Sequence, residues 1–126
     1  MYQNAFNAYQ QVDKATMSGR ETEAAVLTKA ALKLKACRDD WDAPERGARL
    51  DEALKYNQLL WSIFQGELSS EDNPLPRDLK LNLLRLAGFV DKRIFEVMAY
   101  PAAEKLDILI NINHNIAAGL RGSPAG

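Results

Sequence analysis

The side chains best suited to chemistry in this 126-residue chain are its only histidine, His114, and its only cysteine, Cys37. Helical metal sites often pair a histidine with a glutamate three positions earlier, but that position here holds Asn111. A zinc site built on one histidine and one cysteine would also need two carboxylates, and no motif supplies them. We therefore predict no metal site and no cofactor-binding residue.

Three aspartates, Asp39, Asp40 and Asp42, surround Trp41. A calcium loop needs a longer series of oxygen ligands, so we interpret this group as a solvated turn. The sequence holds no glycine-rich phosphate loop, and no carboxylate stands in an unusual setting. We predict no catalytic residue and do not expect the chain to be an enzyme.

The composition indicates a protein of a reducing compartment. A single cysteine cannot form an intrachain disulfide, and we expect Cys37 to be a small buried residue. The 16 basic and 17 acidic side chains are spread evenly, so nucleic acid is not expected as a partner. The N-terminal residues do not resemble a secretory signal, and no apolar run approaches the length of a membrane span. We expect a cytoplasmic protein that does not insert into membranes.

Apolar residues recur at helical spacing through most of the chain and predict an all-α fold. We expect a single domain, residues 1–126, built as a compact bundle of four main helices plus an N-terminal helical segment or arm. The predicted ranges are 1–17 for the arm, then 19–39, 44–68, 77–98 and 102 to 119 or 122 for the main helices, with a loop at 69–76 and a flexible tail at 123–126.

Local signals predict where several helices begin. Ser18 and Glu21 have the spacing of a capping box, so Ser18 is the expected N-cap of the helix at 19–39. Pro44 suits the first turn of the next helix, with Asp42 or Ala43 as its N-cap. The segment 77–98 is apolar in most directions around a helix, which predicts a central and buried helix with its charges on one narrow edge.

The segment 106–122 is locally ambiguous, because Ile and Asn alternate as in a strand. No other segment offers a strand to pair with, and the longer apolar stripe has helical spacing, so we predict a helix. That helix places Asn113 on the core side as a structural polar residue that must find a partner. Replacing Asn113 by Leu is expected to leave the bundle folded, with stability unchanged or raised and with a looser helix register or function.

Aromatic residues supply the first candidate contacts with a partner protein. For Tyr2, Phe6 and Tyr9, which share one helical stripe, partner contact and core packing both remain open. Trp61 is a further candidate, although core packing is the preferred interpretation of this residue. Asn111 and His114 lie one turn apart on the predicted exposed side of the last helix and form a candidate contact surface.

Four sequence blocks, in order and spacing, resemble the FlaF family of bacterial flagellar biosynthesis regulators. The blocks are residues 1–3 with Tyr9, residues 60–64, residues 73–79, and residues 110–113 with 118–120. The resemblance implies a small cytoplasmic helical protein without catalytic activity that acts in flagellin production and filament assembly. From the third block, Asn73 and Pro74 join the candidate partner contacts. Phe89 and His114 depart from the family pattern, where Trp and Arg are expected.

The resemblance favours a non-enzymatic regulator that binds flagellin as a cytoplasmic secretion chaperone or adaptor and promotes its synthesis or export. Flagellin termini are amphipathic segments that are disordered before assembly, and an apolar groove would shield them. The alternative is a post-transcriptional regulator that acts through messenger RNA or through FlbT, the companion regulator that restrains flagellin translation. The even charge distribution argues against the RNA route.

Overall fold

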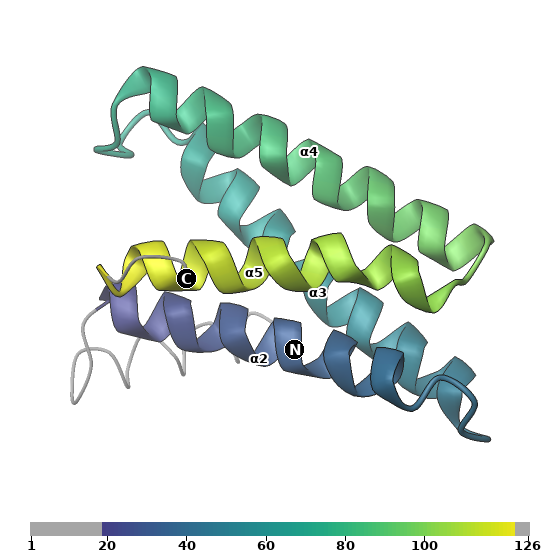
Figure 1. Ribbon diagram of the computed structural model, residues 1–126. Helices are drawn as coiled ribbons and strands as arrows, with labels where there is room; N and C mark the ends of the chain where they lie inside the picture. The colour runs from purple at the N-terminus through teal and green to yellow at the C-terminus, as the bar shows by residue number, and fades with distance from the viewer. Residues whose placement is uncertain (1–18, 123–126) are drawn as a thin grey trace.

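The computed structural model describes residues 19–122, and these residues are almost entirely helical (Figure 1). The finding confirms the predicted all-α fold with four helices packed together. The predicted arm at 1–17, the N-cap Ser18, the contacts Tyr2, Phe6 and Tyr9, and the tail at 123–126 lie outside the described residues. The elements are α2 (Gly19–Asp39), α3 (Arg46–Ser69), α4 (Arg77–Ala99), the short 3-10 helix η1 (Ala103–Leu106) and α5 (Asp107–Leu120).

The predicted start of α3 needs correction, whereas Gly122, one of the two predicted ends of the last helix, is confirmed. Neither Asp42 nor Ala43 caps α3, and Pro44 lies in the turn before the helix. Two successive turns, closed by Ala43 N to Asp40 O at 3.1 Å and Arg46 N to Ala43 O at 3.0 Å, satisfy these backbone groups before α3 begins. At the other end of the chain, Gly119 lies inside α5. Gly122, with φ of 75°, follows the helix in the left-handed conformation that favours glycine.

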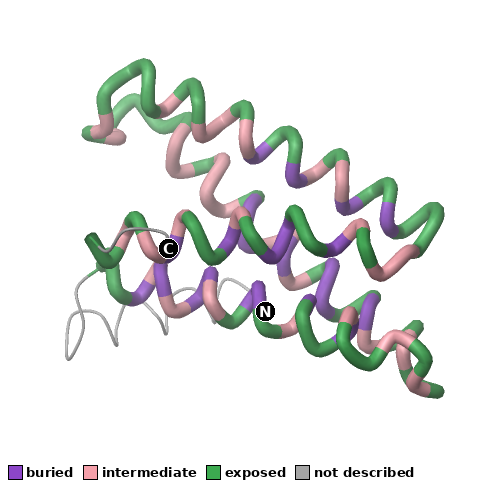
Figure 2. The backbone as a smooth tube through the Cα atoms, in the orientation of Figure 1, coloured by how far each residue is buried: buried purple, intermediate pink, exposed green. Residues whose placement is uncertain are grey.

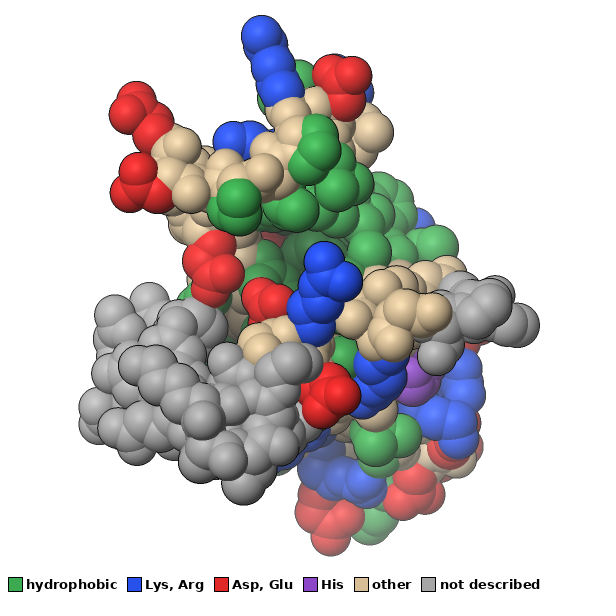
Figure 3. All heavy atoms as spheres, turned by 90° about the vertical axis from the view of Figure 1, so that its left-hand side faces the viewer, with side chains coloured by type: hydrophobic (Ala, Val, Ile, Leu, Met, Phe, Trp, Pro, Cys, Tyr) green, Lys and Arg blue, Asp and Glu red, His purple; other side chains and the backbone are tan. Residues whose placement is uncertain are grey.

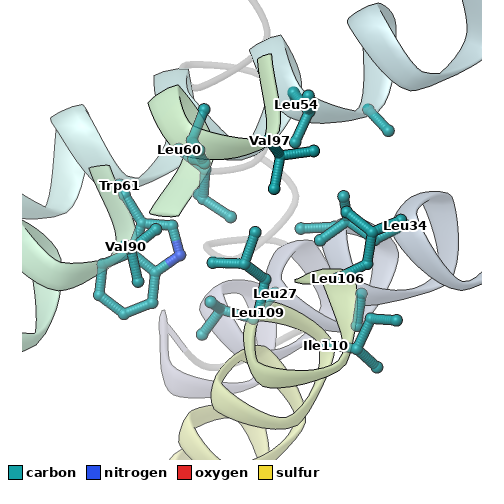
Figure 4. Close-up of a cluster of buried hydrophobic side chains, with 14 of the residues drawn as sticks. Leu27, Leu34, Leu54, Leu60, Trp61, Val90, Val97, Leu106, Leu109 and Ile110 are labelled. Carbon is teal, nitrogen blue, oxygen red and sulfur yellow. The ribbon is translucent and has the colours of Figure 1, made fainter. Parts of the chain in front are cut away.

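Helices α2 and α5 run antiparallel along each other. Arg38 near the end of α2 donates to Asp107 at the start of α5, at 2.9 Å, and Arg121 after α5 donates to Thr28 near the middle of α2, at 3.1 Å. Helix α3 packs against α2, and α4 packs against α3. Side chains from all four helices and η1 form one apolar core, part of which Figure 4 shows with Trp61 beside Val90.

The prediction that the helix at 77–98 is central and buried is wrong. Helix α4 packs along α3 and touches η1, but its contact with α5 is at most marginal, so only one narrow face meets the core (Figure 2). The sequence pattern records which side chains are apolar, whereas burial requires a neighbouring element on each side. The buried residues of α4 are Ala87, Val90, Ile94 and Val97, and its exposed large apolar residues are Leu79, Leu81, Phe89, Phe95 and Met98.

Candidate partner-binding cleft

A hydrogen-bonded polar group crosses the apolar core from α5 to α2. Asn113 of α5 accepts a hydrogen bond from Trp61 Nε1 at 2.9 Å and donates Nδ2 to Oδ1 of Asn57 at 2.6 Å. Asn57 in turn donates to the backbone carbonyl of Ala30 on α2 at 3.2 Å and to that of Ala53 on its own helix at 2.9 Å. These bonds satisfy the two buried amides and the indole, and they fix α5 and α2 relative to α3.

The structure places Asn113 on the core side of α5, as the sequence predicted, with 1% of its surface exposed. Trp61 is a core residue at 2% exposure and stacks edge-on against Phe64, with ring centroids 5.6 Å apart. In this conformation its ring offers no open surface to a partner. Asn57 lies at helical spacing among the buried apolar residues of α3, and its role was not predicted from the sequence. An amide inside an apolar stripe was the available signal, the same signal that identified Asn113.

Asn73 organises the connection between α3 and α4. Its Nδ2 donates to the backbone carbonyl of Glu67 at 3.0 Å, and its Oδ1 accepts a bond from the backbone N–H of Leu75 at 3.0 Å. The second bond is an Asx turn, which an asparagine before a proline readily forms. Asn73 is therefore partly buried by its own loop, while Pro74 is exposed beside it.

An open apolar cleft lies between the first half of α4 and the second half of α5. At its closed end, Arg93 of α4 donates to the backbone carbonyl of Lys105 at 3.5 Å. Leu86 and Leu79 lie two and four turns before Arg93 on the same face of α4. Ile112 lies on α5, which follows Lys105 and the rest of η1. We define the α4–α5 cleft by these faces and the α3 residue between them: Phe64, Leu79, Leu83, Leu86, Ile112, Ile116 and Leu120.

Helices α4 and α5 diverge towards the loop that joins α3 to α4 (Figure 1). Between Trp61 and Ala87 no residue is buried, although that stretch of chain contains many apolar side chains. Phe64, Leu86 and Ile116 pack only partly against the core, and Leu79 is 44% exposed. Figure 3 looks into the open end, where hydrophobic side chains gather beneath the α3–α4 connection.

Burial raises the pKa of two titratable side chains, Glu67 and Cys37. Burial raises the pKa of the Glu67 carboxyl, on the last part of α3, because desolvation penalises its charged form. Burial also raises the pKa of the Cys37 thiol, which lies in the core as expected. A thiol of this kind holds little thiolate, so it reacts slowly with electrophiles in the folded protein.

The other sequence candidates lie away from the cleft. Asn111 and His114 are both exposed on α5, on the side predicted for them. Trp41 packs partly against the core, and the guanidinium of Arg46 lies 4.3 Å from its ring centroid. Within residues 19–122, no group of three His, Cys, Asp or Glu side chains is placed to hold a metal ion. Across that same range no helix is long and apolar enough to cross a membrane.

Comparison with known families identifies the chain. Residues 5–120 match the family described as flagellar protein FlaF. The chain belongs to the FlaF family. The match spans α2, α3, α4, η1 and α5, so both the buried amide group and the α4–α5 cleft lie inside the FlaF domain. Neither the curated proteins nor the solved structures gave a match. FlaF is a flagellar protein family rather than an enzyme family.

Proposed function

We propose that this FlaF protein is a non-enzymatic regulator that binds flagellin in the cytoplasm as a secretion chaperone or adaptor. In this role it promotes flagellin synthesis or export. Membership of the FlaF family supports a flagellar role. The observation that carries the proposed mode of action is the α4–α5 cleft, an apolar surface contributed by three helices and left open at one end.

The shape and chemistry of the cleft suit an amphipathic helix. Leu79, Leu83 and Leu86 form one wall, and Ile112, Ile116 and Leu120 form the other, so a guest helix would contact aliphatic side chains on two sides. Proteins commonly bind amphipathic segments in this way, through apolar anchors one or two turns apart. A terminal segment of unassembled flagellin has this chemistry, and its burial would prevent aggregation before export.

Titration of the full chain with purified flagellin and with its terminal fragments tests the proposal. The informative variant is Leu79→Asp, at the exposed rim of the cleft. The matched control is Leu32→Asp, because Leu32 is 53% exposed on the solvent side of α2. We expect Leu79→Asp to weaken binding by about 10- to 100-fold, which corresponds to the loss of one buried leucine contact. Leu32→Asp should leave the affinity unchanged.

Absence of binding to any flagellin fragment, with the protein shown to be folded, would overturn the proposal. The same titration with FlbT tests the alternative route through that regulator. A gel-shift assay with flagellin messenger RNA at two salt concentrations tests the RNA route, which predicts strongly salt-dependent binding. The exposed Asn111 and His114 are proposed as a second contact surface, and substituting both by Ala shows whether either partner uses it.

A further inference from the structure

We infer that this chain forms a two-fold symmetric dimer in which α4 packs antiparallel against α4 of a second copy. The contact surface is the outer stripe, which we define as a row along α4 that repeats every three or four residues: Leu81, Leu84, Gly88, Asp91, Phe95 and Met98. By helical spacing the outer stripe lies on the opposite side of α4 from Leu79 and Leu86 of the α4–α5 cleft. The inference is therefore independent of the proposed function, and the dimer leaves the cleft open.

The first argument is apolar surface that nothing in the described fold covers. Phe95 is 59% exposed, and Leu81 and Met98 are exposed as well. The described elements that pack against α4 are α3 and η1, and they meet its buried side, which carries Val90 and Ile94. Figure 2 shows α4 at the edge of the molecule, with exposed residues along its length. Neighbouring exposed apolar side chains of this size mark an interaction surface.

The order of side-chain sizes along the outer stripe favours a second copy of the chain as the partner. Two large apolar residues come first, two positions with little side chain at the surface follow, and two large apolar residues come last. At the first central position, Gly88 has no side chain. At the second, Gln65 of α3 donates to Asp91 Oδ2 at 3.3 Å and draws this carboxylate towards α3. The order therefore reads the same in both directions along the helix.

An antiparallel pair uses this symmetry, because a two-fold axis places the same stripe on both sides of the interface, running in opposite directions. Leu81 then meets Met98 of the second copy, and Leu84 meets Phe95 of the second copy. The central positions face each other, so the helices come closest where the side chains are smallest. A parallel pair would bring the two Asp91 carboxylates together and align the helix dipoles, and both effects are unfavourable.

Gly88 supplies a further argument, because the fold of one chain does not require glycine there. A glycine inside a helix is destabilising relative to alanine. A Cβ added at Gly88 would meet no atom within 4 Å, and Gly88 does not have a positive φ. A second helix packed on the outer stripe gives the missing side chain a role, since the distance between two helix axes depends on the side chains at their contact.

The charges beside the outer stripe are compatible with self-association. The flank that faces away from α3 carries two acidic and two basic exposed side chains: Asp78, Glu96, Arg85 and Lys92. This flank is neutral overall, and in the antiparallel pair Arg85 falls between Lys92 and Glu96 of the second copy. An ion pair between Arg85 and Glu96 is therefore within reach on each side. The whole chain carries a net charge of -1, which is too small to keep two copies apart.

Analytical ultracentrifugation of the full chain, at protein concentrations from about 10 μM to 1 mM, tests for the dimer. We expect a monomer–dimer equilibrium. Phe95→Asp should weaken the dimer by about 100-fold, because the change occurs at two symmetry-related contacts and each loses about tenfold. The matched control is Phe89→Asp, which changes an exposed aromatic residue of the same helix outside the outer stripe and should leave the dimer unchanged.

A native chain that stays monomeric throughout this range would overturn the inference, and so would a dimer that Phe95→Asp leaves intact. Gly88→Gln provides a second check that does not depend on disrupting the fold. It should raise the thermal midpoint, because it removes a glycine from the helix interior, and it should still weaken the dimer by crowding the closest approach. Gly66→Gln on α3, where an added Cβ also meets no atom within 4 Å, is the control and should raise the midpoint only. Equal dimer affinities for Gly88→Gln and the native chain would contradict the inference.

Mixed samples test the antiparallel arrangement. One copy carries a spin label at Ala99→Cys, an exposed position beside the outer stripe, while the native Cys37 is buried. The other copy carries isotope-labelled methyl groups and no spin label, so that only contacts between copies are observed. We expect broadening of the Leu81 methyl signals. Broadening at Met98 instead would show a parallel pair, broadening at Ile116 would show that the copies meet through the cleft, and either result would overturn the inference.

Discussion

Asn113 of α5 donates a hydrogen bond to Asn57 of α3 across 2.6 Å, and both side chains are almost completely withdrawn from solvent. The two residues are 56 positions apart in the sequence. A buried amide pair of this kind is stable only while every donor and acceptor has a partner, because unpaired polar groups are costly in an apolar core. The pair therefore makes the packing of α5 on α3 specific.

Replacing Asn113 by Leu should lower the free energy of unfolding by about 2–4 kcal/mol, since it leaves Trp61 Nε1 and Asn57 Oδ1 without partners. This differs from the expectation drawn from the sequence, in which stability was unchanged or raised. Urea unfolding measures the effect. The exposed Asn111→Leu serves as the control and should change stability by less than about 0.5 kcal/mol. An Asn113→Leu variant as stable as the native chain would contradict the role of the amide pair.

Replacing Trp61 by Phe removes the indole donor and leaves Asn113 Oδ1 unpaired, at an expected cost of about 1–3 kcal/mol. The double variant Trp61→Phe with Asn113→Leu should lose less free energy of unfolding than the sum of the two single variants. Each single variant leaves either the indole N–H or the amide oxygen buried without a partner, whereas the double variant removes both groups. A double-mutant cycle by urea unfolding measures the difference. Strictly additive effects would show that the hydrogen bond contributes nothing to stability.

Glu67→Gln should stabilise the protein at neutral pH. The folded-state pKa of Glu67 is raised above its unfolded value, so folding favours the protonated form. The favourable contribution is fully present below the unfolded pKa and is lost as the pH rises through the folded pKa. The difference in thermal midpoint between Glu67→Gln and the native chain should therefore be greatest at pH 7 and should vanish near pH 4. A difference that grows on acidification would reverse the sign and contradict the assignment.

Asn73→Ala should lower the free energy of unfolding by about 1 kcal/mol, because it removes both the Asx turn to Leu75 and the bond to the Glu67 carbonyl. Asp72→Ala, at an exposed position in the same loop, is the control and should be nearly neutral. Thermal unfolding compares the two variants. An Asn73→Ala variant with a smaller effect than its control would show that the loop is held by other contacts.

The sequence by itself determined the helices and the family. Helical spacing placed α2 at residues 19–39 and marked Asn113 as a core-side amide, because both properties depend on neighbours three or four positions away. The four sequence blocks identified the FlaF family for the same reason: each block is short and local.

Only the tertiary structure decided which apolar faces are covered and which partner each buried amide finds. Helix α4 is apolar around most of its circumference, yet it meets the core along one face because α5 packs against α2 rather than against α4. The bonds from Asn113 to Asn57 and Trp61 likewise join residues more than 50 positions apart. Relationships of this range depend on how the helices pack, and the periodicity of one segment carries no information about them.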